Sequence, residues 1–159
     1  LLLELVSQGA VGINHTLQDQ PGGDVDRVMT HPLTAVASDG SVFKFGQGNP
    51  HPRSYGCYPR LLGHYVRERR LLTLPWAIHK MTSLAAENTG LAGRGTITEG
   101  AFADLVLFEP ATVSDRATRE EPNLPSVGIV GVWVNGERVY TDAGTTGKRP
   151  GRVLRRREG

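Results

Sequence analysis

The sequence is poor in the residues that would crosslink a small domain or span a membrane. It has one cysteine, Cys57, so no disulfide can form within the chain. A single cysteine is compatible with a reducing compartment, and we expect a cytoplasmic protein. It contains no run of about 18 apolar residues, the length a transmembrane helix needs. We therefore expect no membrane partner.

The basic residues give little reason to expect nucleic-acid binding. The net charge is only +2, and the basic side chains crowd the last twelve residues: Lys148, Arg149, Arg152, Arg155, Arg156 and Arg157. A nucleic-acid interface usually combines a basic face with aromatic side chains, and this segment has no aromatic residue. A solvated tail is the simpler interpretation, and no nucleic-acid partner is expected.

The remaining composition is that of a globular chain whose beginning is unusual. Of its 159 residues 38% are hydrophobic, which is enough for a core. It opens with Leu-Leu-Leu-Glu-Leu-Val, without Met and without the flanks of a signal peptide. Residues 1–8 resemble the last turns of a helix. We therefore expect the C-terminal part of a longer protein.

The first third of the chain predicts a strand–helix–strand unit. Residues 10–17 form a short mixed run that predicts a strand. Asp24 is a suitable N-cap for a helix over residues 25–31, which the following proline ends. Residues 33–38 are nearly all apolar or small, which predicts a strand buried on both faces, as in a parallel sheet. This βαβ order is typical of a barrel or an open α/β sheet.

The middle of the chain predicts a long loop followed by helices. Residues 39–58 are rich in Gly and Pro and lack periodicity, which predicts a loop of functional importance. Pro59 suits the first position of a helix. Thr73 is a plausible N-cap for the next helix, and a third short helix is expected over residues 83–88, closed by Gly90.

From Gly93 onward the pattern changes to short β-rich runs punctuated by glycine. Residues 103–109 predict a strand. Residues 131–140 contain Asn135-Gly136 between two β-prone runs, a strong signal for a hairpin with a type I′ turn. Residues 112–126 are predicted to be an irregular excursion. This region is expected to form a small antiparallel β module.

Three side chains are candidates for chemistry. Asp39 follows the apolar run directly, and His51 and Arg53 follow in the long loop. Catalytic groups of (β/α)₈ barrels stand at the carboxyl ends of strands in this way. Each residue also has a plain structural interpretation: Asp39-Gly40 as a turn, Arg53 as a surface ion-pair residue, and His51 as a residue that shapes the loop.

Several motifs together resemble a known family. They are Ser38-Asp39-Gly40, His51-Pro52-Arg53, the segments 55–60 and 62–68, Lys80-Met81-Thr82, the segment 95–107, Val134-Asn135-Gly136 and the segment 149–154. They are similar to the C-terminal half of the N-acyl-D-amino-acid deacylases (D-aminoacylases), which belong to the metal-dependent amidohydrolase superfamily. The similarity covers nearly the whole chain, more loosely before residue 33.

The resemblance implies an α/β fold. The family has a (β/α)₈ TIM barrel that bears a β-sandwich built from both chain ends. Residues 1–92 are then expected to hold the last βα units of the barrel with the active-site Asp loop. Residues 93–159 are expected to form the C-terminal part of the sandwich, and the N-terminal remainder of the same protein is expected as a partner.

The resemblance also implies a chemistry, the zinc-dependent hydrolysis of the linear amide bond of small N-acyl-D-amino acids. Asp39 matches the aspartate that shuttles the proton, and Arg53 matches the arginine that binds the substrate carboxylate. His51 is included as a candidate substrate-binding residue. The zinc ligands of the family lie on earlier strands, and the chain has no H-x-H or H-x-x-x-H pair of its own. We therefore predict no metal ligand in this chain.

Two other functions remain open at this stage. One is a different amidohydrolase, such as a cyclic-amide hydrolase, in which Asp39 would have the same role. Arg53 discriminates between the two, because only a substrate with a free α-carboxylate requires a cation. The other is a non-catalytic remnant whose β module packs against a partner.

Overall fold

A computed structural model describes residues 20–42 and 44–154. The chain divides after Pro32 into two compact units, which are described separately. The helix predicted over residues 1–8 and the strand predicted over residues 10–17 lie outside the described residues.

The described part of the first unit contains one helix, α2 (Asp24–Thr30), which confirms the predicted helix. The predicted cap is wrong, because Asp24 lies inside the helix and Gly23 occupies the N-cap without a side-chain hydrogen bond. The carboxylate of Asp26 accepts a hydrogen bond from the Gly22 backbone N–H at 2.7 Å. Asp26, two positions after the predicted cap, therefore binds the backbone just before the helix.

The strand predicted over residues 33–38 does not form in the part of the chain that the structure describes. The segment has no strand assignment, and its side chains are exposed or half-buried. A parallel strand forms only when a neighbouring strand supplies its hydrogen-bond ladder, and both of its faces are buried only when helices cover the sheet. The four described strands pair only with one another, so none of them lies beside this segment.

The first helix of the second unit begins earlier in the sequence than predicted. Helix α3 (Arg53–Arg60) begins inside the segment predicted to be a loop, with Pro52 at the N-cap, and runs directly into the π-helix η1 (Leu61–Glu68). Pro59 therefore lies inside a helix and not at its first position. The helix thus begins directly after Pro52, and not at Pro59.

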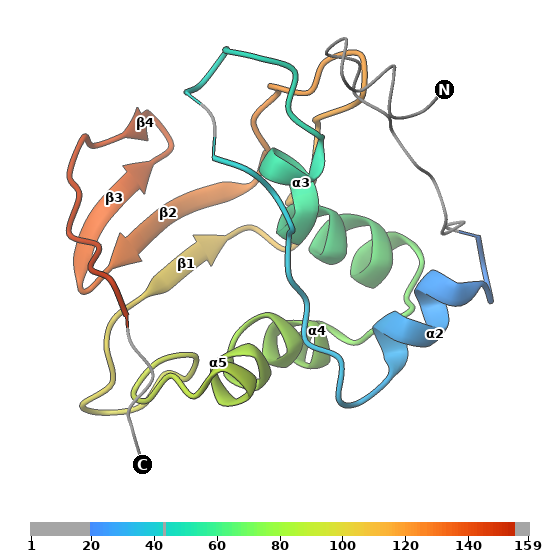
Figure 1. The fold of residues 1–159 in the computed structure, drawn as a ribbon, viewed down its shortest axis with the longest axis horizontal. Coiled ribbons are helices and arrows are strands. Elements are labelled where there is room, and N and C mark those ends of the chain that lie inside the picture. The colour runs from blue at the N-terminus through green and yellow to red at the C-terminus, as the bar shows by residue number, and fades with distance from the viewer. Residues whose placement is uncertain (1–19, 43, 155–159) are drawn as a thin grey trace, which may run out of the picture. The chain divides into compact units, whose positions relative to one another are not determined.

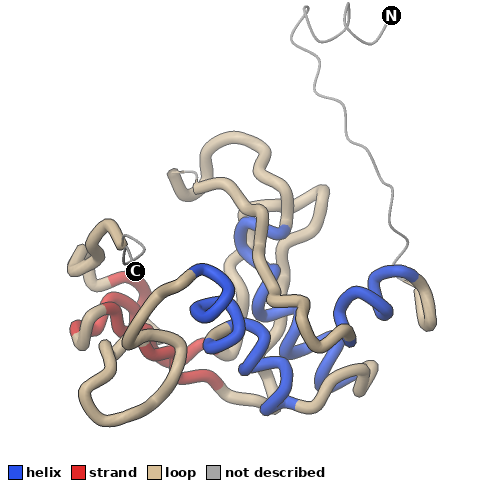
Figure 2. The backbone as a smooth tube through the Cα atoms, turned by 60° about the horizontal axis from the view of Figure 1, so that its bottom comes forward, coloured by secondary structure: helices blue, strands red, loops and turns tan. Residues whose placement is uncertain are grey.

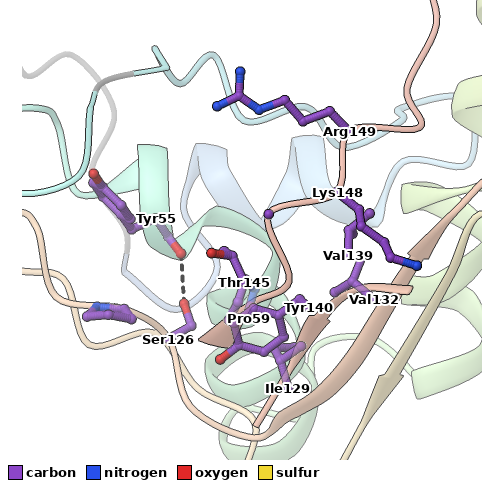
Figure 3. Close-up of a pocket in the computed structure, with 12 residues that line it drawn as sticks. Tyr55, Pro59, Ser126, Ile129, Val132, Val139, Tyr140, Thr145, Lys148 and Arg149 are labelled. Carbon is purple, nitrogen blue, oxygen red and sulfur yellow. Dashed lines mark hydrogen bonds between the residues drawn. The ribbon is translucent and has the colours of Figure 1, made fainter. Parts of the chain in front are cut away.

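The proline inside α3 is accommodated by a contact from outside the helix. Because proline has no N–H, the carbonyl four residues before it, that of Tyr55, loses its helical donor. The Ser126 hydroxyl donates to this carbonyl at 2.7 Å (Figure 3). The π-helix that follows has the wider hydrogen-bonding pattern seen at such irregularities. Ser126 thereby joins α3 to the segment between the strands Leu105–Phe108 and Ile129–Val134.

Two short helices complete the helical part, α4 (Leu74–Met81) and α5 (Ser83–Thr89). The predicted cap of α4 is confirmed, since the Thr73 hydroxyl accepts the Trp76 N–H at 3.4 Å. The end of α5 is confirmed as well, with Gly90 in the left-handed conformation at φ 71°. The buried apolar residues of η1, α4 and α5, and of the turn between η1 and α4, form a core: Leu61, Leu62, Tyr65, Leu72, Ala77, Leu84 and Ala86.

The β module predicted downstream is confirmed as one antiparallel sheet of four strands. The strands are β1 (Leu105–Phe108), β2 (Ile129–Val134), β3 (Glu137–Thr141) and β4 (Gly144–Thr145), in that order. Figures 1 and 2 show the strands gathered together, with α3, α4 and α5 as a separate group within the same unit. Residues 112–126 are irregular as predicted, apart from an isolated antiparallel bridge between Ser114 and Val127.

The predicted hairpin turn is confirmed and is held from several sides. Asn135 and Gly136 both have positive φ, 49° and 82°, as a type I′ turn requires. The Asn135 amide group accepts from Arg94 at 2.7 Å and donates to the Pro150 carbonyl at 2.7 Å. Its backbone N–H donates to Asp104, which also pairs with Arg94. Burial alone would raise the pKa of Asp104, but these bonds lower it below its ordinary value.

Gly128 is expected to be a sensitive position in this unit. It has φ +78°, and a Cβ there would lie 2.5 Å from the backbone of Val113. We expect Gly128→Ala to lower the free energy of unfolding by about 3 kcal/mol. Gly136→Ala is the matched control, because Gly136 has φ +82° but open space around it, and its cost should be about 1 kcal/mol. Equal losses in chemical denaturation would show that the Val113 contact is unimportant.

Candidate active site

Asp39 lies in a tight turn that packs against the beginning of α3. Its φ is 45°, a left-handed conformation that Asp and Asn tolerate better than most residues. The Gly40 N–H donates to the Ser38 hydroxyl at 3.2 Å. A Cβ on Gly40 would lie 2.9 Å from the Ser54 Cα, so the close approach requires glycine. The turn leaves the Asp39 side chain 86% exposed.

Arg53, the first residue of α3, binds Asp39 at two points. Its Nε donates to the Asp39 carbonyl at 2.8 Å, and a terminal nitrogen lies 2.7 Å from the carboxylate. The planar guanidinium suits such two-point binding. The structure therefore brings together the predicted catalytic residue and the predicted substrate-binding residue, which are 14 positions apart in the sequence.

His51 contacts the same helix start. Its Nδ1 accepts the Arg53 backbone N–H at 3.1 Å, one of the N–H groups that the first turn of a helix leaves without a partner. The hydroxyl of Ser54 accepts the Ser41 N–H at 3.2 Å and so holds the far side of the Asp39 turn. The contact made by His51 supports the interpretation that it shapes the loop.

Cys57 lies one turn further along α3 and contacts the segment before Asp39. Its Sγ is 3.6 Å from the Ala37 carbonyl, to which it donates. Burial raises the pKa of the thiol, and the positive charge of Arg53 opposes this only in part. The thiol is therefore protonated at neutral pH, as a hydrogen-bond donor must be. Together, α3 side chains bind Ala37, Asp39 and Ser41.

A cavity of about 580 Å³ lies between α3 and the sheet (Figure 3). Tyr55 and Pro59 line it from α3, and Val132 and Tyr140 line it from the sheet. Neither Asp39, His51 nor Arg53 is among its lining residues. The side chains of Asp39 and Arg53 are therefore exposed on the surface of this chain, and they lie outside this cavity.

The described residues do not fit a zinc site by themselves. Within residues 20–42 and 44–154, no three His, Cys, Asp or Glu side chains come close enough to hold a metal ion. Asp39 is bound by Arg53, and the thiol of Cys57 is bound to a carbonyl, so neither is arranged as a ligand.

Among the residues that the structure describes, none of the helices combines the length and the apolar composition of a membrane-spanning segment.

Three residues that the sequence did not single out for this role hold the Asp39 segment: Ser54, Cys57 and Lys80. Pro59 predicts a helix start that would leave Ser54 in a loop, whereas Pro52, at the N-cap of α3, is the sequence signal that places Ser54 in the first turn of a helix. The motif Lys80-Met81-Thr82 alone does not indicate a role for Lys80. It follows the buried Ala77 by three positions, a spacing that places it on the same face of α4.

Comparison with known proteins identifies the class. The model of the amidohydrolase family Amidohydro_3 matches residues 8–140, which is most of the chain. The chain belongs to this amidohydrolase family.

The curated relatives are more specific. The chain is 48% identical to an N-acyl-D-aspartate deacylase and 45% identical to a D-aminoacylase, both from Alcaligenes xylosoxydans xylosoxydans. Each match covers 96% of this chain but only 29% or 30% of the relative. The chain thus spans less than a third of the length of these relatives. The resemblance to the deacylases is confirmed.

Solved structures of the same kinds of enzyme also match the chain. A crystal structure of D-aminoacylase matches with a TM-score of 0.74 and 46% identity, covering 79% of this chain and 26% of that protein. The N-acyl-D-glutamate deacylase from Bordetella bronchiseptica, in complex with zinc and a phosphonate inhibitor, matches with a TM-score of 0.72 and 50% identity. This second match covers 82% of this chain and 27% of that protein.

Proposed function

We propose that this chain is the C-terminal section of a zinc-dependent enzyme that hydrolyses N-acyl-D-amino acids. The observation that carries the proposal is the Asp39–Arg53 pair, which places a proton acceptor beside a carboxylate-binding cation. The similarity to three deacylases of D-amino acid derivatives supports it. The activity would belong to a polypeptide of the relatives' length, because the described residues supply no metal site.

The architecture proposed for that polypeptide is a (β/α)₈ barrel with a β-sandwich. Residues 1–92 would contribute the last βα units of the barrel, and residues 93–159 would contribute strands to the sandwich. The apolar run 33–38 supports this assignment, because its composition suits a strand whose two faces are both buried. We place the protein in the cytoplasm, on the grounds of its single cysteine.

In the proposed reaction Asp39 acts as the general base and then the general acid. Amide hydrolysis requires a proton to leave the attacking water and to reach the departing nitrogen. One carboxylate can perform both transfers if it is held near both atoms, and the turn at Asp39 exposes its carboxylate. Zinc, when bound, would make water more acidic and polarise the carbonyl.

Arg53 would bind the α-carboxylate of the substrate. Its guanidinium has five N–H donors, and the two contacts with Asp39 occupy only part of them. The cation can therefore hold Asp39 and a substrate carboxylate at once. His51 would act on the same step indirectly, by fixing the first turn of α3.

The proposed function is tested with the complete, zinc-loaded polypeptide. N-acetyl-D-amino acids and their L-enantiomers should be offered in parallel, and release of the free amine measured. We expect the D-series to be hydrolysed with a kcat/KM that exceeds that of the L-series by about 10² or more. A folded enzyme that binds zinc and hydrolyses neither series would disprove the substrate assignment.

A further inference from the structure

Lys80 is a fully buried cation for which the proposed reaction has no use. It lies near the end of α4, and no part of the side chain is exposed to solvent. Its ammonium lies 5.4 Å from the centre of the Trp76 ring, and burial lowers its pKa. Burying an ammonium group is costly unless it makes compensating hydrogen bonds. The hydrogen bonds of Lys80 therefore show which part of the structure justifies burying its charge.

Lys80 makes two hydrogen bonds to the segment that leads to Asp39. Its Nζ donates to the Thr34 carbonyl at 2.7 Å, and its own carbonyl accepts the Val36 N–H at 3.1 Å. In a parallel ladder, one residue donates to the position before its neighbour and accepts from the position after it. Lys80 reproduces this pattern around residue 35, with the ammonium in place of a backbone N–H. One helical residue thus substitutes for a neighbouring strand.

The same segment is held at its other end by α3. Side chains of α3 bind the Ala37 carbonyl, the Asp39 carbonyl and the Ser41 N–H. Residues 34–41 are therefore hydrogen-bonded at both ends, to Lys80 of α4 at the beginning and to the first turns of α3 at the end. The bonds from α3 contact Asp39 directly, whereas those of Lys80 fix the position of the backbone three to five residues before Asp39.

We propose that Lys80 is a positioning residue for Asp39, holding residues 34–36 in the place of a partner strand so that the carboxylate keeps its direction. This inference rests on the proposed function of the Asp39 site. Lys80 is not expected to touch the substrate. Its effect should therefore fall on kcat and leave KM nearly unchanged.

The test uses Lys80→Met in the complete polypeptide, because methionine is similarly flexible and apolar but cannot donate. We expect faster hydrogen–deuterium exchange in peptides covering residues 33–41, and a kcat about tenfold lower with KM nearly constant. Leu84→Ala is the control, since it creates a cavity at a buried site on α5. It should lower the melting temperature while leaving exchange at residues 33–41 and kcat close to wild type.

Unchanged exchange at residues 33–41 in Lys80→Met would overturn the inference. A loss of kcat no larger than that of Leu84→Ala would also overturn it. If Lys80→Met does not fold, the Val36 amide of the wild-type protein decides. Protection that is lost together with that of the α4 amides as denaturant is added supports the inference, whereas protection that persists after α4 has opened, or exchange at the rate of an unstructured chain, overturns it. The exchange result remains valid if the wild-type enzyme shows no deacylase activity, so failure of the proposed function is recognised separately.

Discussion

Replacing Asp39 by asparagine is expected to lower kcat/KM of the complete enzyme on N-acetyl-D-amino acids by a factor of about 10² or more. The amide of asparagine cannot accept the proton of the attacking water. Asparagine also adopts the left-handed conformation that Asp39 has at φ 45°, so the turn should survive. Steady-state kinetics should be measured together with the bound zinc and the melting temperature. Both of these should stay near the wild-type values.

Asp115→Asn provides the matched control for this experiment. Asp115 is a second carboxylate that pairs with an arginine of α3, in this case Arg60 at 3.4 Å. It lies outside the Asp39 turn, and its replacement should leave kcat/KM close to wild type. If Asp39→Asn retains most of its activity, or if both variants lose equal activity, Asp39 is not the proton shuttle.

Replacing Arg53 by methionine should have the second large effect, and it should depend on the substrate. For N-acetyl-D-amino acids, kcat/KM should fall by about 10², because the α-carboxylate loses a charge-assisted pair. For the corresponding α-carboxamides, which wild type should hydrolyse poorly, the variant should lose much less. The kinetics of both substrates with both proteins give the interaction between Arg53 and the carboxylate directly.

Arg60→Met is the control for this comparison, since Arg60 lies on the same helix and also pairs with a carboxylate. It should not change the preference for carboxylate over carboxamide. An equal loss on both substrates in Arg53→Met would mean that Arg53 acts only by holding Asp39. The contacts of its Nε and its terminal nitrogen with Asp39 make this the alternative to exclude.

The local features of the fold were predictable from sequence. The hairpin at Asn135-Gly136 and the stop of α5 at Gly90 depend on backbone conformations that glycine and asparagine permit, and both are observed. The cap at Thr73 is a contact between neighbouring residues and was also predicted correctly. Interactions within a few residues leave a direct trace in the sequence.

Features that depend on distant residues were not predictable in the same way. Pro59 inside α3 is tolerated because Ser126, far along the chain, donates to the freed carbonyl. The apolar pattern of residues 33–38 predicts a strand, but a strand also requires partners, which the described residues do not place beside it. Asp39 and Arg53 were both predicted as site residues, yet their direct pairing required the structure.

The most direct test of the central claim is a crystal structure of the complete, zinc-loaded polypeptide with a bound phosphonate analogue of an N-acyl-D-amino acid. The distances from the ligand to Asp39 and Arg53 are the quantities to measure. We predict the ligand α-carboxylate within hydrogen-bonding distance of the Arg53 guanidinium, and Asp39 within the same reach of the phosphonate oxygens. A ligand bound with its carboxylate on other residues, and with Asp39 remote from the phosphonate, would contradict the account.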